Sequence, residues 1–371
     1  MHMVTIVQPW FSAVGHPAQS LINTASVLGK QAGFNYLISV EPDAPRIESS
    51  ISKLGEHGKV TCFKVSTPSI REGTFKAILQ LRKLLENNRD SEQILFFDAH
   101  LVMLAGLWPL LVGFKKFSRV GMIYLMGPER ILRSRIAGWL VQRFLSYPEA
   151  VLYLRTEELQ EAWHEAFPSV PQARIRYLPS LEIPDDSLIF PDPTPSEQLK
   201  FGIIGQIRRG KGIEYLIPLF QENPQIGALT VAGTFNNLTE REFFPVLLGF
   251  PGFLNTFLSE KDMLQKAADQ DYLIMLYDDW DSRMESAVLY LAARANRPVV
   301  AYNRGWCGRQ VGQFHCGLLA PEDRTKLEDF LSGLPHPGDA EYEDLIHGIK
   351  KFRASHSGKN AKAAFLKALL E

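Results

Sequence analysis

The chain has 371 residues, of which 46% are hydrophobic and 22% charged, a composition typical of a globular protein with two domains of ordinary size. The chain has 40 Lys and Arg residues and 41 Asp and Glu residues. This balance excludes nucleic-acid binding driven by a global excess of basic residues. Cys62, Cys307 and Cys316 are too few and too scattered for a disulfide framework or a zinc site. With no signal-like N-terminus and no apolar run of about 20 residues, we expect a cytoplasmic protein.

Short apolar runs alternate with longer helical patterns, which predicts parallel sheets with crossover helices. In the first half, strands are expected at Val4–Val7, Tyr36–Val40, Val60–Val65, Ile94–Phe97, Gly121–Leu125, Val151–Leu154 and Arg174–Leu178. Helices are expected at Gln19–Gly33, Gly73–Glu86 and Arg130–Phe144. In the second half, strands are expected at Lys200–Ile204, Leu229–Ala232, Phe253–Leu258, Tyr272–Leu276 and Pro298–Tyr302.

A proline-rich run at 184–195 interrupts this rhythm, because it can neither continue a helix nor enter a sheet. We therefore interpret 183–198 as a linker between domains at 1–182 and 199–340. The basic, helical residues 341–371 are expected to cross back to the first domain. The whole pattern predicts an α/β chain with two doubly wound, Rossmann-like domains facing a central cleft.

The most informative segment follows the strand expected at Lys200–Ile204. A glycine-rich turn from Gly205 to Gly212 carries Arg208, Arg209 and Lys211 and opens a predicted helix. Glycines let backbone amides approach a ligand, and a helix N-terminus favours anions, so this turn predicts a site for a di- or triphosphate.

Two other interpretations of this turn stay open. The first is a solvated basic turn, because most runs of charged residues are simply exposed to water. The second is a P-loop, because Gly205 to Lys211 fits the pattern G-x-x-x-x-G-K. Against the P-loop, Gly212 stands where a Ser or Thr would hold magnesium.

This segment resembles the donor-phosphate motif of retaining glycosyltransferases with the GT-B fold, the GT4-like group. In both, a strand leads into a basic turn, and a Lys-Gly pair opens the following helix. The similarity continues in order over about 120 residues, through Leu229–Gly233, Phe253–Leu258, Asp271–Leu276 and Arg297–Ala301. The resemblance implies that Lys211 binds the donor phosphates. Gln206 stands at the place of the family's arginine, so Arg208 or Arg209 is expected to replace it. Leu258 and Tyr277, at the ends of two of these strands, are assigned to the donor sugar or nucleotide.

The family also places two glutamates eight residues apart before the last of these strands, one near the donor sugar and one on the ribose. The matching positions hold Arg283 and Leu291. Glu285 lies two residues from the first position and is expected to substitute for it, although it is also an ordinary first-turn acid that complements the helix dipole. Ser286 and Ala287 occupy the place where helix amides would face phosphate.

The run from Asp278 to Asp281 is similar to the Asp-x-Asp that holds manganese in GT-A glycosyltransferases, and hard cations do favour clustered carboxylates. Asp is equally an ordinary N-cap residue before a helix. We expect no metal, and no cofactor besides a nucleotide-sugar donor acting as substrate.

In the first half, the loop after the first strand resembles the one that shapes the acceptor side in this family, which places Gly15 and His16 near the donor sugar. The fourth strand ends in Asp98-Ala99-His100, where the family has H-x-H. The resemblance therefore implies that Asp98 or His100 acts in catalysis with Lys211. A plain turn for Gly15 and His16, and a structural role for His100, are the alternatives.

The stretch from Arg130 to Phe144 predicts a basic amphipathic helix with apolar residues on one face. Two interpretations stay open, namely peripheral contact with the inner face of the cytoplasmic membrane and ordinary packing on the sheet.

The resemblance implies a hexosyltransferase that moves glucose from UDP-glucose to a glycan or lipid-linked glycan in exopolysaccharide biosynthesis, without a metal and with retention. The chain is also similar to glucosyltransferases of cyanobacterial heterocyst envelope-polysaccharide clusters. Two other functions stay open: a nucleotide-sugar epimerase of the same fold, and a degenerate subunit that binds a partner glycosyltransferase.

Overall fold

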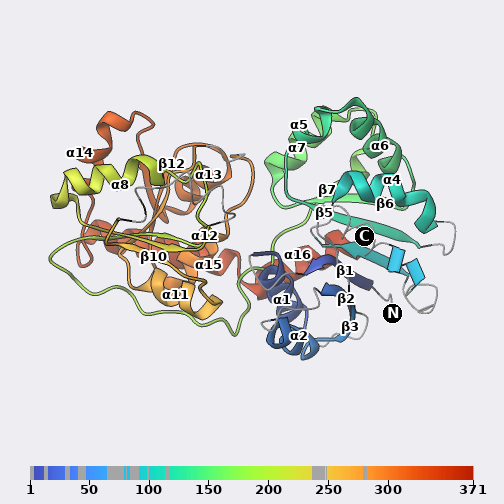
Figure 1. Cartoon of the computed structure of the whole chain (residues 1–371), viewed down its shortest axis with the longest axis horizontal. Helices are drawn as coiled ribbons and strands as arrows, with labels where there is room; N and C mark the ends of the chain where they lie inside the picture. Colours follow the sequence, from blue (N-terminus) through green and yellow to red (C-terminus); the bar gives the residue numbers. More distant parts are fainter. Residues whose placement is uncertain are drawn as a thin grey trace. The chain divides into compact units, whose positions relative to one another are not determined.

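The computed structural model describes residues 4–11, 16–29, 34–40, 47–64, 79–80, 82–83, 92–97, 100–112, 117–235, 247, 249–278 and 282–370. Its contacts divide the chain into two compact units (Figure 1). Unit 1 comprises Met1–Pro184 and Ala361–Glu371, and unit 2 comprises Asp185–Asn360. The expected α/β class with two doubly wound parallel sheets is confirmed.

The described part of unit 1 is built on a seven-stranded parallel sheet in the order β3-β2-β1-β4-β5-β6-β7. Its strands are β1 (Val4–Phe11), β2 (Phe34–Val40), β3 (Lys59–Lys64), β4 (Gln93–Phe96), β5 (Arg119–Tyr124), β6 (Ala150–Leu154) and β7 (Ile175–Tyr177). β4 and β6 are buried at every residue, which explains why Ile94–Phe96 and the whole of β6 are continuous rather than alternating apolar runs. The strand order reverses between β1 and β4, which pair in parallel.

Helices cover both faces of this sheet, with α1, α2 and the end of α16 on one face and α4 and α6 on the other (Figure 1). The helices are α1 (His16–Leu28), α2 (Ile47–Gly55), α4 (Leu101–Val112), α5 (Glu129–Leu132), α6 (Arg135–Leu145), α7 (Glu157–Ala166) and α16 (Gly358–Leu370). Phe365 and Leu369 of α16 enter the same buried cluster as Leu21 and Ala25 of α1. Lys362 also donates a 3.0 Å hydrogen bond to the carbonyl oxygen of Leu28, so the end of the chain is part of the core of unit 1.

Two helix predictions in unit 1 were wrong in their bounds. The helix expected at Gln19–Gly33 is α1, which begins at His16 and ends at Leu28. The single helix expected at Arg130–Phe144 is two helices, because Ser134 adopts an extended conformation and its hydroxyl group accepts a hydrogen bond from the amide of Ala137. Ser134 therefore caps α6, and periodicity alone did not reveal the break. The helix expected at Gly73–Glu86 lies almost entirely outside the described residues.

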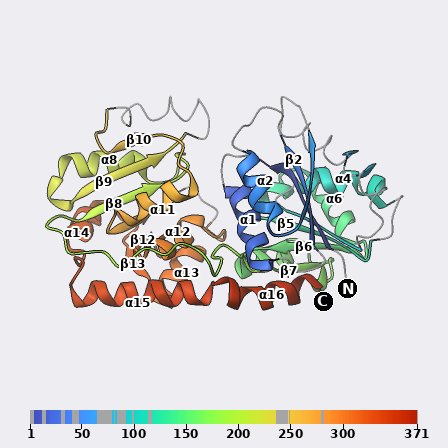
Figure 2. The ribbon, with the colours of Figure 1, turned by 90° about the horizontal axis from the view of Figure 1, so that it is seen from below.

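In unit 2 the described strands form a six-stranded parallel sheet in the order β10-β9-β8-β11-β12-β13. They are β8 (Lys200–Ile204), β9 (Ala228–Gly233), β10 (Phe253–Asn255), β11 (Tyr272–Met275), β12 (Val299–Tyr302) and β13 (Gly317–Ala320). In Figure 2, β8, β9 and β10 lie side by side. The strand expected at Phe253–Leu258 ends already at Asn255, and the sequence patterns did not predict β13.

The helices of unit 2 also lie on both faces of its sheet, with α8 and α14 on one and α11, α12 and α15 on the other (Figure 1). They are α8 (Ile213–Glu222), α11 (Glu260–Ala268), α12 (Ala287–Ala295), α13 (Gly305–Phe314), α14 (Leu327–Ser332) and α15 (Ala340–Ser355). The C-terminal segment expected as one helix is α15 and α16, with His356 and Ser357 between them. Three short 3-10 turns, at Gln172–Arg174, Pro224–Ile226 and Arg324–Lys326, complete the described structure.

Candidate functional site

The sheet of unit 2 reverses its strand order between β8 and β11, the place where open α/β sheets bind ligands beyond the carboxyl ends of their strands. Residues 205–212, which we name the basic loop, follow β8 at this point. The amide of Asp278, just past β11, donates a 2.9 Å hydrogen bond to the carbonyl oxygen of Gly210. The basic loop is therefore fastened to both strands that flank the reversal.

Close backbone contacts determine the path of the basic loop. A Cβ atom on Gly233, at the end of β9, would overlap the carbonyl oxygen of Gly205. Gly212 begins α8 with a φ of 76°, and a Cβ atom there would lie 2.7 Å from the Tyr215 hydroxyl group and 2.9 Å from the carbonyl oxygen of Leu276. These positions require glycine, because the backbone of the loop passes directly against its neighbours.

Lys211 is the most unusual charged residue of the basic loop. Only 7% of its surface is exposed, and burial, aided by the nearby positive charge of Arg208, lowers its pKa to about 7. Within the part of the chain that the structure describes, no carboxylate forms an ion pair with it. A buried ammonium group beside a second cation is a favourable partner for a polyanion. The anion would offset both the lost hydration of the ammonium group and its repulsion by the neighbouring cation.

A second element of the site is the N-terminus of α12. Ser286 caps this helix, its side chain accepting a 3.3 Å hydrogen bond from the amide of Val288, and its hydroxyl group lies 3.1 Å from that of Tyr277. Burial raises the pKa of Tyr277, which keeps its phenol neutral. Arg208 lies close enough to act electrostatically on both Lys211 and Tyr277. The basic loop and the start of α12 therefore form one electropositive region.

Glu285 precedes this helix and is half-buried. Its carboxylate accepts a 2.9 Å hydrogen bond from the hydroxyl group of Tyr290, one turn further along the chain. The structure thus places a carboxylate beside Ser286 and holds it there through an aromatic side chain.

A group of arginine and tyrosine side chains that the sequence patterns did not predict lies beside the basic loop. Arg324 forms an ion pair of 2.9 Å with Asp278, whose other carboxylate oxygen lies 3.7 Å from Arg304. The two guanidinium groups stack over the rings of Tyr215 and Tyr302, at 4.1 and 4.7 Å from the ring centroids. The two hydroxyl groups lie 2.8 Å apart. Arg304 also lines a small recess with Met275, Tyr277, Ser282, Tyr302 and Cys307.

One signal could have found part of this group. Arg304 stands two residues after β12, at a strand end equivalent to those that carry Lys211 and Asp278. Arg324, by contrast, belongs to a short turn after a strand that was not predicted, and its pairing with Asp278 spans 46 residues.

The remaining expected site residues are placed as follows. In unit 2, Gly205 has a φ of 104°, Arg208 is half-buried, Arg209 is exposed, and Ala287 is the first residue of α12. Leu258 is half-buried and follows the edge strand β10, away from the reversal point of the sheet. In unit 1, His100 is exposed and precedes α4, and His16 is the first residue of α1. Gly15 and Asp98 lie outside the described residues.

The described residues contain no group of three His, Cys, Asp or Glu side chains that could hold a metal ion. Asp279 and Asp281 of the acidic run lie outside these residues. Among the helices described, none combines the length and the apolar character that crossing a membrane requires.

No family model and no curated protein sequence matches this chain. Solved structures do resemble it. The Anabaena protein HepE in complex with UDP-glucose superimposes with a TM-score of 0.70 at 13% identity, covering 100% of both chains. Sucrose-phosphate synthase from Thermosynechococcus elongatus gives 0.68 at 13% identity, covering 100% of this chain and 99% of its own. The lipopolysaccharide outer core galactosyltransferase WaaB, in its apo form, gives 0.57 at 9% identity over 99% of each chain.

The chain has the GT-B fold. This confirms the fold that the motif resemblance implied. In GT-B terms, the basic loop and the start of α12 belong to the second of the two Rossmann-like units, which comprises Asp185–Asn360.

Proposed function

We propose that this chain is a nucleotide-sugar-dependent glycosyltransferase whose donor diphosphate binds between the basic loop and the N-terminus of α12. The observation that carries the proposal is the burial of Lys211, next to Arg208, at the point where the sheet of unit 2 reverses its strand order. A buried cation there is costly unless an anion joins it. Nucleotide diphosphates supply that charge.

The proposed donor is UDP-glucose. The support is that HepE, which has this fold over its full length, was solved with UDP-glucose. WaaB, of the same fold, is a galactosyltransferase, so the choice of hexose depends on the measurement below.

In the proposed reaction, the bond between the anomeric carbon of the sugar and the diphosphate oxygen breaks, and a bond forms between that carbon and an acceptor hydroxyl oxygen. The proton of that hydroxyl group leaves with the released nucleoside diphosphate. Negative charge grows on the leaving diphosphate. Lys211, Arg208 or Arg209, and the helix end at Ser286 and Ala287 would stabilise this charge where it develops. These groups supply the positive charge that a metal ion supplies elsewhere, so the proposal requires no metal.

The motif order supports a retaining enzyme of the GT4-like group. We assign donor binding to 199–340, acceptor binding to 1–182, with Gly15, His16, Asp98 and His100 on that side, and a linker role to 183–198. The proposed acceptor is a glycan or lipid-linked glycan in polysaccharide biosynthesis. The enzyme would act in the cytoplasm, in peripheral contact with the inner membrane face.

The test is binding and slow hydrolysis of a panel of UDP-, GDP- and ADP-sugars, with and without EDTA. We expect one donor to bind and to be hydrolysed in EDTA, and the variant Lys211→Ala to lose both. Lys351→Ala, an exposed lysine on α15, is the matched control and should behave as wild type. Loss of hydrolysis in EDTA would contradict the metal-free mechanism, and conversion of the donor sugar without acceptor would favour an epimerase.

One observation favours a second function, a degenerate subunit that binds a partner glycosyltransferase. Arg283 and Leu291 occupy the two positions where the family carries glutamates, and Leu291 lies within α12. Glu285 is the carboxylate expected to compensate, and it already bonds Tyr290. Failure of every donor to bind at millimolar concentration would support this second function and contradict the first.

A further inference from the structure

Helices α5 and α6 of unit 1 expose apolar side chains that the core does not use. Ile136 is 71% exposed, Trp139 is 56% exposed and Leu132 is 47% exposed. They are three of the most exposed large hydrophobic side chains in the described residues, and they fall within eight positions of one another. Three large apolar side chains exposed within so short a segment indicate a contact with another molecule.

The local sequence explains why these side chains face outward. The inner face of α6 is already complete, because Val141, Phe144 and Leu145 are fully buried. Ser134 caps α6 and sets its direction independently of α5. The fold therefore leaves between 47% and 71% of each outward apolar residue uncovered.

Charge accompanies the exposed apolar residues. Arg130, Arg133, Arg135 and Arg143 are all exposed, against the single acid Glu129 in the segment 129–145. The whole chain has a net charge of −1, so this is a local concentration of positive charge. The guanidinium group of Arg143 lies 5.4 Å from the ring centroid of Trp139, so one charge rests directly on the largest exposed ring.

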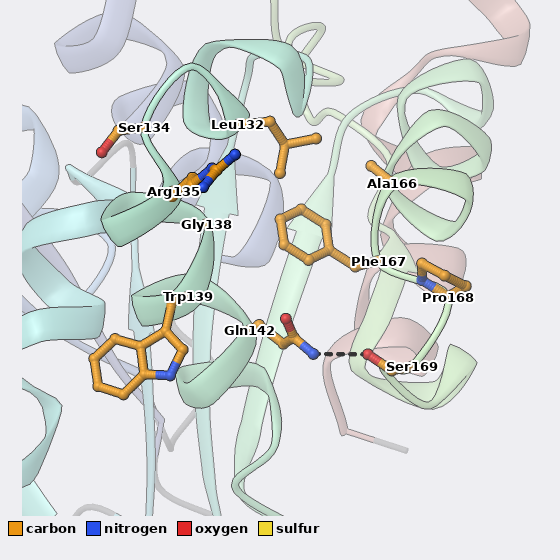
Figure 3. Close-up of a pocket in the computed structure, with 10 residues that line it drawn as sticks. All are labelled: Leu132, Ser134, Arg135, Gly138, Trp139, Gln142, Ala166, Phe167, Pro168 and Ser169. Atoms are coloured by element: carbon orange, nitrogen blue, oxygen red, sulfur yellow. Dashed lines mark hydrogen bonds between the residues drawn. The ribbon is translucent and has the colours of Figure 1, made fainter.

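Beside these residues lies a groove between α6 and the segment that follows α7 (Figure 3). Leu132 and Phe167 face one another across it, whereas Trp139 projects away from Phe167. Gln142 donates a 2.9 Å hydrogen bond to Ser169 and connects the two walls.

We propose that this α5–α6 surface, made of Leu132, Ile136, Trp139 and the four arginines, docks on a membrane rich in anionic lipids. Tryptophan is favoured at the boundary between headgroups and acyl chains, and isoleucine and leucine enter the apolar layer. The arginines contact lipid phosphates, which contributes most at a negatively charged leaflet. The inference deepens the membrane contact of the proposed function, and it rests on that function only for the nature of the acceptor.

The charge pattern favours a lipid surface over other occupants. A protein partner or a second copy of this chain would need an acidic surface with a matching apolar centre. A soluble glycan would not require Ile136, whose side chain offers no hydrogen bond and is more exposed than that of Trp139. A lipid layer satisfies the apolar and the basic residues together.

The experiment is sedimentation of the full chain with vesicles, without donor or acceptor, so that its result is independent of sugar transfer. The vesicles are phosphatidylcholine alone or phosphatidylcholine with about 30% phosphatidylglycerol. We expect binding to the anionic vesicles only, weakened by raising the salt from about 0.1 M to about 0.5 M. Failure to bind anionic vesicles would overturn the proposal, and so would equal binding to both compositions.

Variants then locate the contact. Ile136→Ser with Trp139→Ser, and separately Arg133→Gln with Arg135→Gln, should each reduce binding by about tenfold or more. The matched controls are Leu188→Ser, a leucine that is 50% exposed in unit 2, and Lys351→Gln on α15, and both should bind as wild type. If the controls lose as much binding as the test variants, the α5–α6 surface is not the contact.

A direct readout of depth is quenching of tryptophan fluorescence by lipids brominated on their acyl chains. Trp139→Phe removes this one fluorophore, so the quenching that it removes reports on Trp139 itself. Phenylalanine keeps an apolar ring at the position, so vesicle binding is retained. We expect Trp139→Phe to bind vesicles and to lose this part of the quenching. Unchanged quenching would place Trp139 outside the lipid. If the chain forms dimers without vesicles and Ile136→Ser dissociates them, the surface instead binds a second copy of this chain.

Discussion

The hydroxyl group of Tyr290 donates a 2.9 Å hydrogen bond to the carboxylate of Glu285. The Tyr290 ring in turn packs against Trp306 and Phe352, with centroids 5.9 and 5.7 Å away. The carboxylate at the start of α12 is therefore positioned by a ring that α13 and α15 hold in place.

Tyr290→Phe should raise the donor KM roughly threefold to tenfold and leave kcat nearly unchanged, because a single hydrogen bond to the carboxylate is lost. Steady-state kinetics with the donor that binds in the panel measures this. Tyr342→Phe is the control, since its hydroxyl group bonds the backbone oxygen of Asp271 at 2.7 Å without contacting the basic loop. An unchanged donor KM in Tyr290→Phe would mean that Glu285 does not contact the donor.

Donor binding should take up a proton near neutral pH. The pKa of Lys211 is about 7 in the free protein, and a bound diphosphate raises it because the anion favours the charged form. Affinity for the donor should therefore fall as the pH rises above 7, by at most about tenfold per pH unit. Calorimetry in two buffers of different ionisation enthalpy gives the number of protons. A buffer-independent binding enthalpy at pH 8 would show that Lys211 does not meet the phosphates.

Removing the buried charge should stabilise the protein while it abolishes donor binding. Between the folded pKa of about 7 and the ordinary value of 10.5, the unfolded chain binds more protons at Lys211 than the folded chain does. The free energy of unfolding therefore rises with pH across this window and is lowest, for this group, below pH 7.

Lys211→Met should consequently be more stable than wild type below pH 7, by on the order of 4 kcal/mol, and the difference should shrink towards pH 10. Urea unfolding at several pH values measures both. Lys351→Met, which changes an exposed lysine, should leave the stability curve unmoved. If the free energy of unfolding depended on pH in the same way in Lys211→Met and in the wild type, the lowered pKa of Lys211 would be contradicted.

Gly233→Ala should destabilise unit 2 by about 2–4 kcal/mol, because the new methyl group would overlap the carbonyl oxygen of Gly205. The displaced basic loop should also lose donor affinity. Gly312→Ala is the matched control, since nothing lies within 4 Å of a Cβ atom at that position in α13, and it should stabilise by up to about 1 kcal/mol. Thermal unfolding and donor titration report the two effects. An unchanged donor affinity in Gly233→Ala would show that the basic loop does not form part of the donor site.

Much of the fold could be predicted from the sequence because its signals are local. Continuous apolar runs such as Phe201–Ile204 are buried strand segments, and β8, which begins one residue earlier at Lys200, has the predicted bounds. The glycines and cations of the basic loop are adjacent in the chain, so a phosphate site could be hypothesised from one short segment. Where a boundary depended on a cap, as at Ser134, or on edge position, as at Asn255, the local pattern gave the wrong end.

The order of the strands and the partners of the charged groups were decided by the tertiary structure alone. Which strands lie beside β8 depends on contacts between residues far apart in the chain, and that order alone places the basic loop at the reversal point of the sheet. The same holds for the pairing of Arg324 with Asp278 and for the low pKa of Lys211. A residue type states which charge a side chain can carry, but burial and distant neighbours determine what that charge costs and what it can bind.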